Sequence, residues 1–437
     1  MAITPFDSAI WRGLYGDEEI AALFTDSAEV RAMLLFEGAL AKVQGRLGMI
    51  PEVSAAAISR ASQTVMLNPA GLAAGAAAAG VPAPALVEAF RKAMEAPEHA
   101  AHIHFGATSQ DVIDTGLILR LRRALEIIEG RLTALIDAAE AKAKAEADTV
   151  MAARTRSQIA TPTTLGAKIA VWRSSLARCR DRLAEANQRA MRISLAGASG
   201  TNAAMAGRGE EVAAGVAEEL GLAHDPIPWH SARDGIAEIG GALTLLTGSL
   251  GKIGIDLIGL MQSEVREVSA GTSGGSSTMP HKSNPVGPEA LIALARANAG
   301  IVGRLYEAQL HAQEREGAAW ALEWLTLPQI VIAAGASLRH AAGLIETLEA
   351  RPDAIRASMA ATKGLMLAEA AVFALAAHMP RPDAQALVKA ACGEAAATGA
   401  HLREILAAMT DAPVEWAAVF NPANYTGQAA RAARGEG

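Results

Sequence analysis

The sequence is poor in the residues that mark a disulfide framework or a β-rich fold. Its two cysteines, Cys179 and Cys392, lie far apart among 437 residues, so we expect reduced thiols and no disulfide framework or zinc motif. Aromatic residues make up only 4%, and alternating β-branched runs between turn residues are scarce, which argues against an all-β fold. Ala, Leu, Glu and Arg fill most segments instead, and the sequence predicts an all-α fold.

The sequence also lacks a basic cluster and an uninterrupted apolar span. Lys plus Arg number 39 against 46 Asp plus Glu, a net charge of −7, whereas binders of nucleic acid or anionic membranes carry a clustered positive surface. No stretch of about 18 residues runs apolar without charge or glycine. The first residues lack the basic-then-apolar order of a signal peptide. We therefore expect a cytoplasmic protein with no nucleic-acid or membrane partner.

Helical periodicity continues well beyond ordinary length in five segments. They are residues 111–148, 163–192, 233–268, 285–316 and 321–350, and each would span on the order of 45 Å or more. Residues 236–261 are apolar on more than one face, which one helix hairpin cannot cover. We expect the long helices to pack into a bundle and into other subunits of an elongated homo-oligomer; a monomeric bundle is the alternative.

Proline punctuation divides the chain into three parts. Shorter amphipathic pieces precede the long helices, and a smaller helical end follows them after the Arg-Pro-Asp segments at 351–353 and 381–383. The sequence predicts an N-terminal helical domain at 1–110, a central long-helix domain at 111–350 and a C-terminal helical domain at 351–437.

The most unusual stretch, between two of the long helices, is GTSGGSSTMPHKSNP at residues 271–285. Its glycines allow a hinge and its serines expose hydroxyls. Lys282 and Asn284 add a cation and an amide that suit a carboxylate or another anion. A polar linker with a generic anion site at a helix start would have the same composition. The stretch does not match a phosphate-cradling G-x-x-x-x-G-K-[ST] loop, because His281 precedes Lys282.

A second polar stretch precedes the first long helix. His102 and His104 form an H-x-H, but no further ligand set at suitable spacing accompanies them, so we predict no metal site. Thr108 and Ser109 could present hydroxyls and N–H groups to an anion, or could cap the helix together with Asp111.

These stretches resemble a known superfamily. GSSTMPHKSNP at 275–285 resembles the G-S-S-x-M-P-x-K-x-N signature of the fumarase/aspartase superfamily, and HFGATSQDVIDT at 104–115, TRSQIA at 155–160 and ASGT at 198–201 are similar to its other shared regions, in the same order. The resemblance covers most of the chain. It implies the superfamily's all-α fold, a D2 homotetramer built on a 20-helix core, and active sites shared among three subunits.

Within the superfamily, the chain resembles the family of 3-carboxy-cis,cis-muconate cycloisomerases. This likeness lies in residues 5–9, 22–26, 31–34, 228–234 and 421–427. It implies a cofactor-independent lactonising enzyme of the protocatechuate branch of the β-ketoadipate pathway. The alternative is another lyase, such as an adenylosuccinate lyase, that eliminates fumarate from a succinyl substrate. Arg156 differs from both, since the lyase has a catalytic histidine there and the cycloisomerases usually have tryptophan. The lyase's glutamate–arginine pair becomes Glu323-Trp324.

The resemblance also implies roles for residues of this chain. Ser276 would carry the proton to carbon, with Ser277 as the other candidate, and Lys282 would stabilise the serine alkoxide. Lys282 and Asn284 would bind one substrate carboxylate.

Five other residues complete the predicted site. Thr108 and Ser109 would bind a second carboxylate, and Gln158 would donate to substrate. His104 is interpreted as a substrate-binding or structural hydrogen-bonding residue. Arg156 would meet a third carboxylate with two hydrogen bonds or would form a surface salt bridge.

Overall fold

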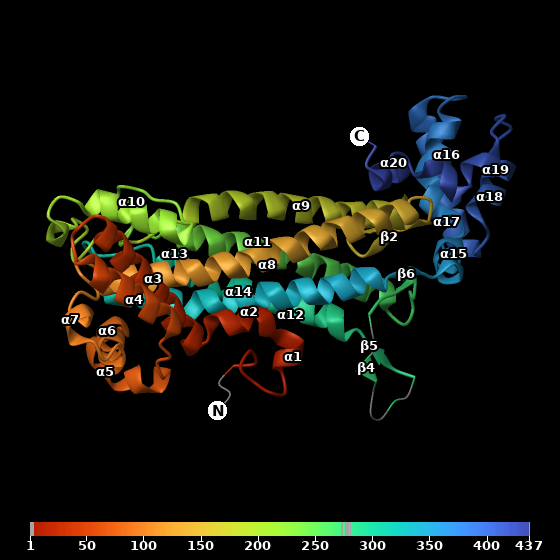
Figure 1. Ribbon diagram of the computed structural model, residues 1–437. Helices are drawn as coiled ribbons and strands as arrows, with labels where there is room; N and C mark the ends of the chain where they lie inside the picture. The colour runs from red at the N-terminus through yellow and green to blue at the C-terminus, as the bar shows by residue number, and fades with distance from the viewer. Residues whose placement is uncertain (1–3, 272–273, 276–278, 280, 437) are drawn as a thin grey trace. The chain divides into compact units, whose positions relative to one another are not determined.

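The computed structural model describes residues 4–271, 274–275, 279 and 281–436. The all-α prediction is confirmed, because helices make up most of the described chain (Figure 1). Four of the five predicted long segments each contain one long helix, namely α8 (Ser109–Ala145), α9 (Leu165–Ala190), α11 (Asp234–Met261) and α14 (Gly317–Glu346).

Two of the predicted long helices end early. The segment 285–316 divides into α12 (Val286–Ile301) and α13 (Gly303–Glu307), since Gly300 and Gly303 each cost about 1 kcal/mol in a helix relative to alanine. The segment 233–268 ends at Met261, and Arg266 then takes a left-handed φ of 51°. Beyond it, β3 (Val268–Ser269) pairs antiparallel with β6 (Glu349–Ala350). Local periodicity overestimated both helices because glycines and turns interrupt the helix without changing the apolar pattern.

The described chain forms two compact units, each built from three stretches of sequence. Unit 1 comprises Met1–Arg131, Cys179–Gly248 and Leu294–Ser337, and unit 2 comprises Leu132–Arg178, Ser249–Ala293 and Leu338–Gly437. The predicted division at 110 and 350 follows the order of elements in the sequence and stays a prediction.

Unit 1 is organised around α3 (Asp26–Arg46). Thr25 caps this helix by accepting from the N–H of Ala28, and Asp26 lies in its first turn. The helix packs against α4 (Glu52–Thr64) and α10 (Gly209–Leu220), as Figure 1 shows. Its apolar stripe shares a core with the first turns of α8 and with Trp320 of α14. The remaining short elements of unit 1 are α1 (Arg12–Tyr15), α2 (Glu18–Ala21), η1 (Ala22–Phe24), η2 (Pro69–Leu72), α5 (Ala73–Ala79), α6 (Ala83–Ala93), α7 (Pro97–Ala100) and η3 (Ala203–Met205).

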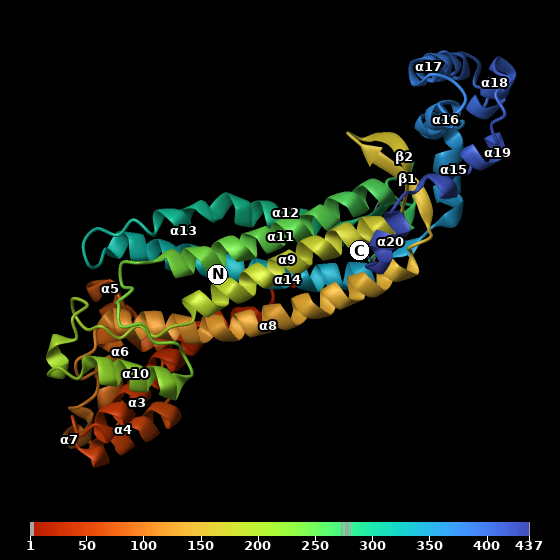
Figure 2. The same ribbon diagram turned by 90° about the horizontal axis from the view of Figure 1, so that it is seen from above.

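Unit 2 contains a small helical cluster and short hairpins. The helices α16 (Ala368–Leu375), α17 (Arg381–Thr398) and α18 (Leu402–Met409) share one apolar core and lie together in Figure 2. Around them are α15 (Pro352–Ala361), η4 (Leu365–Leu367), α19 (Trp416–Val419), η5 (Pro422–Tyr425) and α20 (Ala429–Arg434). The hairpins are formed by β1 (Val150–Thr155) with β2 (Gln158–Thr164) and by β4 (Gly274–Gly275) with β5 (Ser283–Asn284).

Two long helices are unusually apolar. By length and composition alone, α11 and α14 could each cross a membrane, and the bent pair Pro352–Ala361 and Leu365–Leu375 passes the same test. Of the most apolar 18-residue stretch in each helix, 50% is buried within the chain in α11 and 67% in α14. Leu245 and Ile255 of α11 and Leu325 of α14 stay exposed. The apolar composition therefore reflects core packing together with faces that the single chain leaves uncovered.

Candidate active site

The turn before α8 presents the first group of predicted site residues. Thr108 lies directly before the helix, and its N–H donates to Oδ2 of Asp111 over 2.9 Å. This contact is one half of a capping box, so the capping interpretation of Asp111 is confirmed. The side chains of Thr108 and Ser109 are half-buried, and among the described residues neither hydroxyl has a protein partner. Both hydroxyls are therefore available to a ligand.

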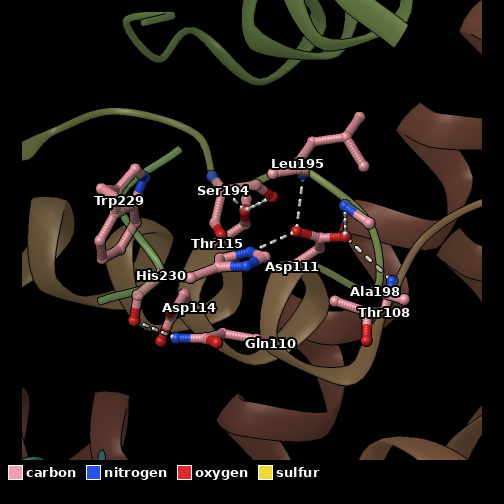
Figure 3. A network of polar contacts seen from close by, with 12 residues as sticks. Thr108, Gln110, Asp111, Asp114, Thr115, Ser194, Leu195, Ala198, Trp229 and His230 are labelled. Carbon is pink, nitrogen blue, oxygen red and sulfur yellow. Dashed lines mark hydrogen bonds and ion pairs between the residues drawn. The ribbon is translucent and has the colours of Figure 1, made fainter. Parts of the chain in front are cut away.

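Asp111 joins this turn to a second loop, as the dashed contacts in Figure 3 show. Its fully buried carboxylate also accepts from the N–H groups of Ala196 at 2.9 Å and Gly197 at 3.0 Å. Nε2 of His230 lies 2.8 Å from Oδ1 of Asp111, and since a carboxylate only accepts, the ring carries its proton on Nε2. This one carboxylate thus accepts four hydrogen bonds, which offset the cost of burying its charge.

A second buried cluster lies one helical turn along α8. Arg233 is 1% exposed and donates to Asp114 over 2.6 and 3.1 Å and to Glu323 over 2.8 and 2.5 Å. The indole N–H of Trp320 adds a 3.0 Å bond to Asp114. Burial opposes the charge of Arg233, but the two carboxylates outweigh it and raise the pKa of Arg233. Burial, which is the largest cause, and the negative charge of Asp114 raise the pKa of Glu323, while Arg233 opposes them.

A third set of contacts fixes the loop at 196–201 from another side. Gln110 donates to the carbonyl of His230 over 2.8 Å and accepts from Nε of Arg315 over 2.6 Å. Arg315 also donates to the carbonyl of Ala198 over 3.3 Å. Side chains of α8 and backbone groups of the loop therefore form one polar network, drawn in part in Figure 3.

His104 lies in the same turn as Thr108. It takes a left-handed φ of 65°, uncommon for a residue with a side chain. Its Nδ1 is 2.7 Å from Oε1 of Glu37 on α3. Among the described residues Nε2 has no protein partner, and 20% of the side chain is exposed. His104 can therefore offer Nε2 to a ligand.

The second predicted group lies on the hairpin of β1 and β2. Arg156 and Ser157 form its two-residue turn, with φ values of 51° and 65°. Positive φ at both positions is the pattern of a type I′ turn, which normally selects asparagine and glycine. Arg156 and Gln158 are exposed, and no ion pair of Arg156 occurs within the described residues. A salt bridge of Arg156 is thus not observed within this part of the chain.

The third group lies on the glycine- and serine-rich stretch. Ser276 and Ser277 fall outside the described residues. Lys282 is exposed, and Asn284 is half-buried in β5, where it pairs with Gly274. The predicted residues that the structure describes therefore occupy three separate segments, one in unit 1 and two in unit 2.

Several polar residues of the network were not predicted as site residues. His230 and Arg233 were noted only as part of the landmark at 228–234, although their three-residue spacing matches that of Asp111 and Asp114. Glu323 was noted only for its place in the family pattern.

Glu37 and Gln44 of α3 were also missed. They lie among Val30, Met33 and Leu40 on the buried face of the helix. Polar residues seven apart on an apolar stripe were the signal that could have identified them.

A cavity of about 410 Å³ lies behind the loop at 196–201. Its lining includes Ser194, Asn202, Glu210, His224 and Trp229. The Ser194 Oγ and the Asn202 Oδ1 are buried and have no partner among the described residues. None of the predicted site residues that the structure describes lines this cavity. Within the same part of the chain, no three His, Cys, Asp or Glu side chains cluster to hold a metal ion.

Comparisons with known proteins bear on the fold and on the family. The profile of the lyase family matches residues 16–300, and that of the adenylosuccinate lyase C-terminus matches residues 364–434. The chain is 41% identical to the 3-carboxy-cis,cis-muconate cycloisomerase of Pseudomonas aeruginosa over 93% of this chain and 91% of that protein. It is 34% identical to the nitrosuccinate lyase of Streptomyces davaonensis over 97% and 93% of the two chains.

A solved structure gives the same result. The crystal structure of the 3-carboxy-cis,cis-muconate lactonizing enzyme from Pseudomonas putida superposes with a TM-score of 0.92 at 37% identity, covering 98% of each chain. The long-helix fold together with the three polar segments is that of an enzyme of the fumarase/aspartase type. The chain belongs to the lyase family, in the branch that includes the 3-carboxy-cis,cis-muconate cycloisomerases.

Proposed function

We propose that this chain is a cytoplasmic, cofactor-independent 3-carboxy-cis,cis-muconate cycloisomerase that forms a lactone in the β-ketoadipate pathway. The observation that carries the proposal is the 41% identity over 93% of the chain to an enzyme of that name. Ser276, Lys282 and Asn284 of the superfamily signature are all present in the sequence.

The reaction adds a carboxylate oxygen of the substrate to a carbon of a conjugated double bond. A C–O bond forms, the π electrons move to the neighbouring carbon and delocalise into its carboxylate, and a proton then binds to that carbon. Atoms and electrons balance without an oxidant or reductant. The enzyme must supply a proton donor and cationic or N–H groups around the carboxylates.

Each of these groups has a candidate in the chain. Ser276 delivers the proton, with Ser277 as the other candidate, and Lys282 stabilises the alkoxide. The three substrate carboxylates are divided among three sets of residues: His104, Thr108 and Ser109; Lys282 and Asn284; Arg156 and Gln158. The unpartnered hydroxyls and the exposed cations of these sets suit anions.

The active enzyme is proposed to be a D2 homotetramer that shares its sites between subunits. The apolar side chains of Val171, Leu245, Ile255 and Leu325 are between 53% and 65% exposed on the long helices of the single chain. Exposed apolar surface of this kind is typical of an interface. Light scattering coupled to gel filtration should give a mass near four times 45.0 kDa.

The direct test is turnover of 3-carboxy-cis,cis-muconate by the purified protein, followed by absorbance beside adenylosuccinate. We expect conversion of the muconate alone, unchanged after exhaustive treatment with EDTA. Elimination from a succinyl substrate is the second candidate, supported by the 34% identity to a nitrosuccinate lyase and the match to the adenylosuccinate lyase C-terminus. Turnover of adenylosuccinate or nitrosuccinate without turnover of the muconate would favour that candidate.

A further inference from the structure

A buried carboxylate lies behind the turn that holds His104. The side chain of Glu37 is fully buried in α3, on a face otherwise packed in an apolar core. Its Oε1 contacts Nδ1 of His104 at 2.7 Å, while its Oε2 has no hydrogen-bond partner among the described residues. An ionised carboxylate in such surroundings costs several kcal/mol unless a positive partner accompanies it. A positively charged His104 would offset that cost.

The turn itself is fixed by its neighbours. Gln44, two helical turns after Glu37, donates to the carbonyl of Phe105 over 2.7 Å. Arg91 donates to the carbonyl of Ile103 over 3.0 Å. A Cβ at Gly106, where φ is 76°, would lie 2.9 Å from the side chain of Met205, so the packing admits only glycine there. The turn therefore has anchors other than Glu37.

The protonation of His104 follows from the groups that face it. Burial lowers the pKa of His104, but the hydrogen bond and the charge of Glu37, with a further contribution from Asp111, outweigh burial and the opposing charge of Arg91, so the pKa is raised. With Nδ1–H directed to Glu37, a neutral ring would present a lone pair at Nε2 and repel a carboxylate. The imidazolium presents an N–H instead.

We propose that Glu37 is a positioning residue for the reaction: its carboxylate accepts from Nδ1 of His104 and so holds the ring as an imidazolium whose Nε2–H binds a carboxylate of the substrate. The left-handed backbone of His104 is consistent with a residue held for function rather than for local stability. The identity of the substrate rests on the proposed function, whereas the Glu37–His104 pairing does not.

The test compares Glu37→Gln with a matched control, Gln44→Met, across a pH series. Glutamine keeps the size of Glu37 and an oxygen for Nδ1–H but removes the charge. For the wild type, kcat/KM on the muconate should fall as pH rises through the pKa of His104. In Glu37→Gln this fall should move to lower pH. At pH values above the His104 pKa of both proteins, a shift of about one pKa unit would raise KM roughly tenfold. Wild-type KM should return at acidic pH.

The control loosens the same turn without changing its charge. Gln44→Met loses the bond to Phe105, so we expect any loss of activity to be equal at every pH. A Glu37→Gln profile that falls uniformly, with no shift and no recovery in acid, would overturn the proposal and leave Glu37 a structural residue.

A measurement without turnover separates this inference from the proposed function. Histidine labelled with ¹³C at Cε1 gives ring signals that titrate, and the signal missing from His104→Gln identifies His104. We expect its midpoint above that of an ordinary histidine in the wild type and lower in Glu37→Gln. An ordinary midpoint in the wild type would overturn the pairing even if Glu37→Gln failed to fold. A raised midpoint in a protein inactive on the muconate would retain the pairing and reject the substrate.

Discussion

Asp111 is the residue whose replacement should disturb the candidate site most. Its Oδ1 accepts from Ala196 and His230, and its Oδ2 accepts from Thr108 and Gly197. In Asp111→Asn one of the two oxygens becomes an NH₂ group, which cannot accept. Whichever way the amide is oriented, two buried donors lose their acceptor and face another donor.

The cost follows from that count. Each buried donor left without an acceptor costs about 1–3 kcal/mol, so the substitution should destabilise by about 2–6 kcal/mol. A unit of 150–250 residues loses about 2–4 °C of melting temperature per kcal/mol, which predicts a fall of at least about 4 °C. The turn of Thr108 and the loop at 196–201 would also separate, and a displacement of about 1 Å at a catalytic group can cost about 100-fold in rate.

The assay pairs a thermal melt with steady-state kinetics on the muconate. Asp137→Asn makes the same substitution at an exposed position of the same helix, and we expect it to stay within about 0.5 kcal/mol of the wild type. If Asp111→Asn melted within 2 °C of the wild type with unchanged kcat/KM, Asp111 would not hold the turn and the loop together.

Substitutions at four further residues test other parts of the site. Ser276→Ala should lower kcat by about 10²- to 10⁴-fold without changing the mass of the oligomer, because it removes the proton donor; retention of a tenth of kcat would reassign that role. Arg156→Ala should raise KM and lower kcat, and Arg156→Lys should recover only part, since an ammonium does not reproduce two guanidinium bonds; unchanged kinetics with a lower melting temperature would make Arg156 a structural residue. Arg233→Met should destabilise by about 3–5 kcal/mol, because Asp114 and Glu323 stay buried without their cation. In Glu323→Gln, whose glutamate has a raised pKa, the loss should be smaller, and melts of both variants at neutral pH check that order.

The sequence alone determined the class of fold and the family. Helical periodicity over tens of residues predicts long helices packed together, because a long apolar stripe is buried by packing against other helices. The signature at 275–285 and the regions at 104–115 and 155–160 likewise identify the superfamily without coordinates. The breaks after Ile301 and Met261 were missed, since glycines and turns do not alter the periodic pattern that predicts helices. The β1–β2 hairpin was missed because Arg156 and Ser157 occupy a turn that usually carries asparagine and glycine.

The tertiary structure decided which polar residues work together. Asp111 and His230 are 119 positions apart in the sequence, and Glu37 and His104 are 67 apart. No local spacing relates such residues, because their contact depends on how α3, α8 and the loops pack. Burial then decides their chemistry: the same carboxylates in water would interact weakly, whereas inside the core each must find a donor or a cation. Segment identity can therefore be inferred from sequence, but the pairing of Asp111 with His230 and of Glu37 with His104 exists only in the folded chain.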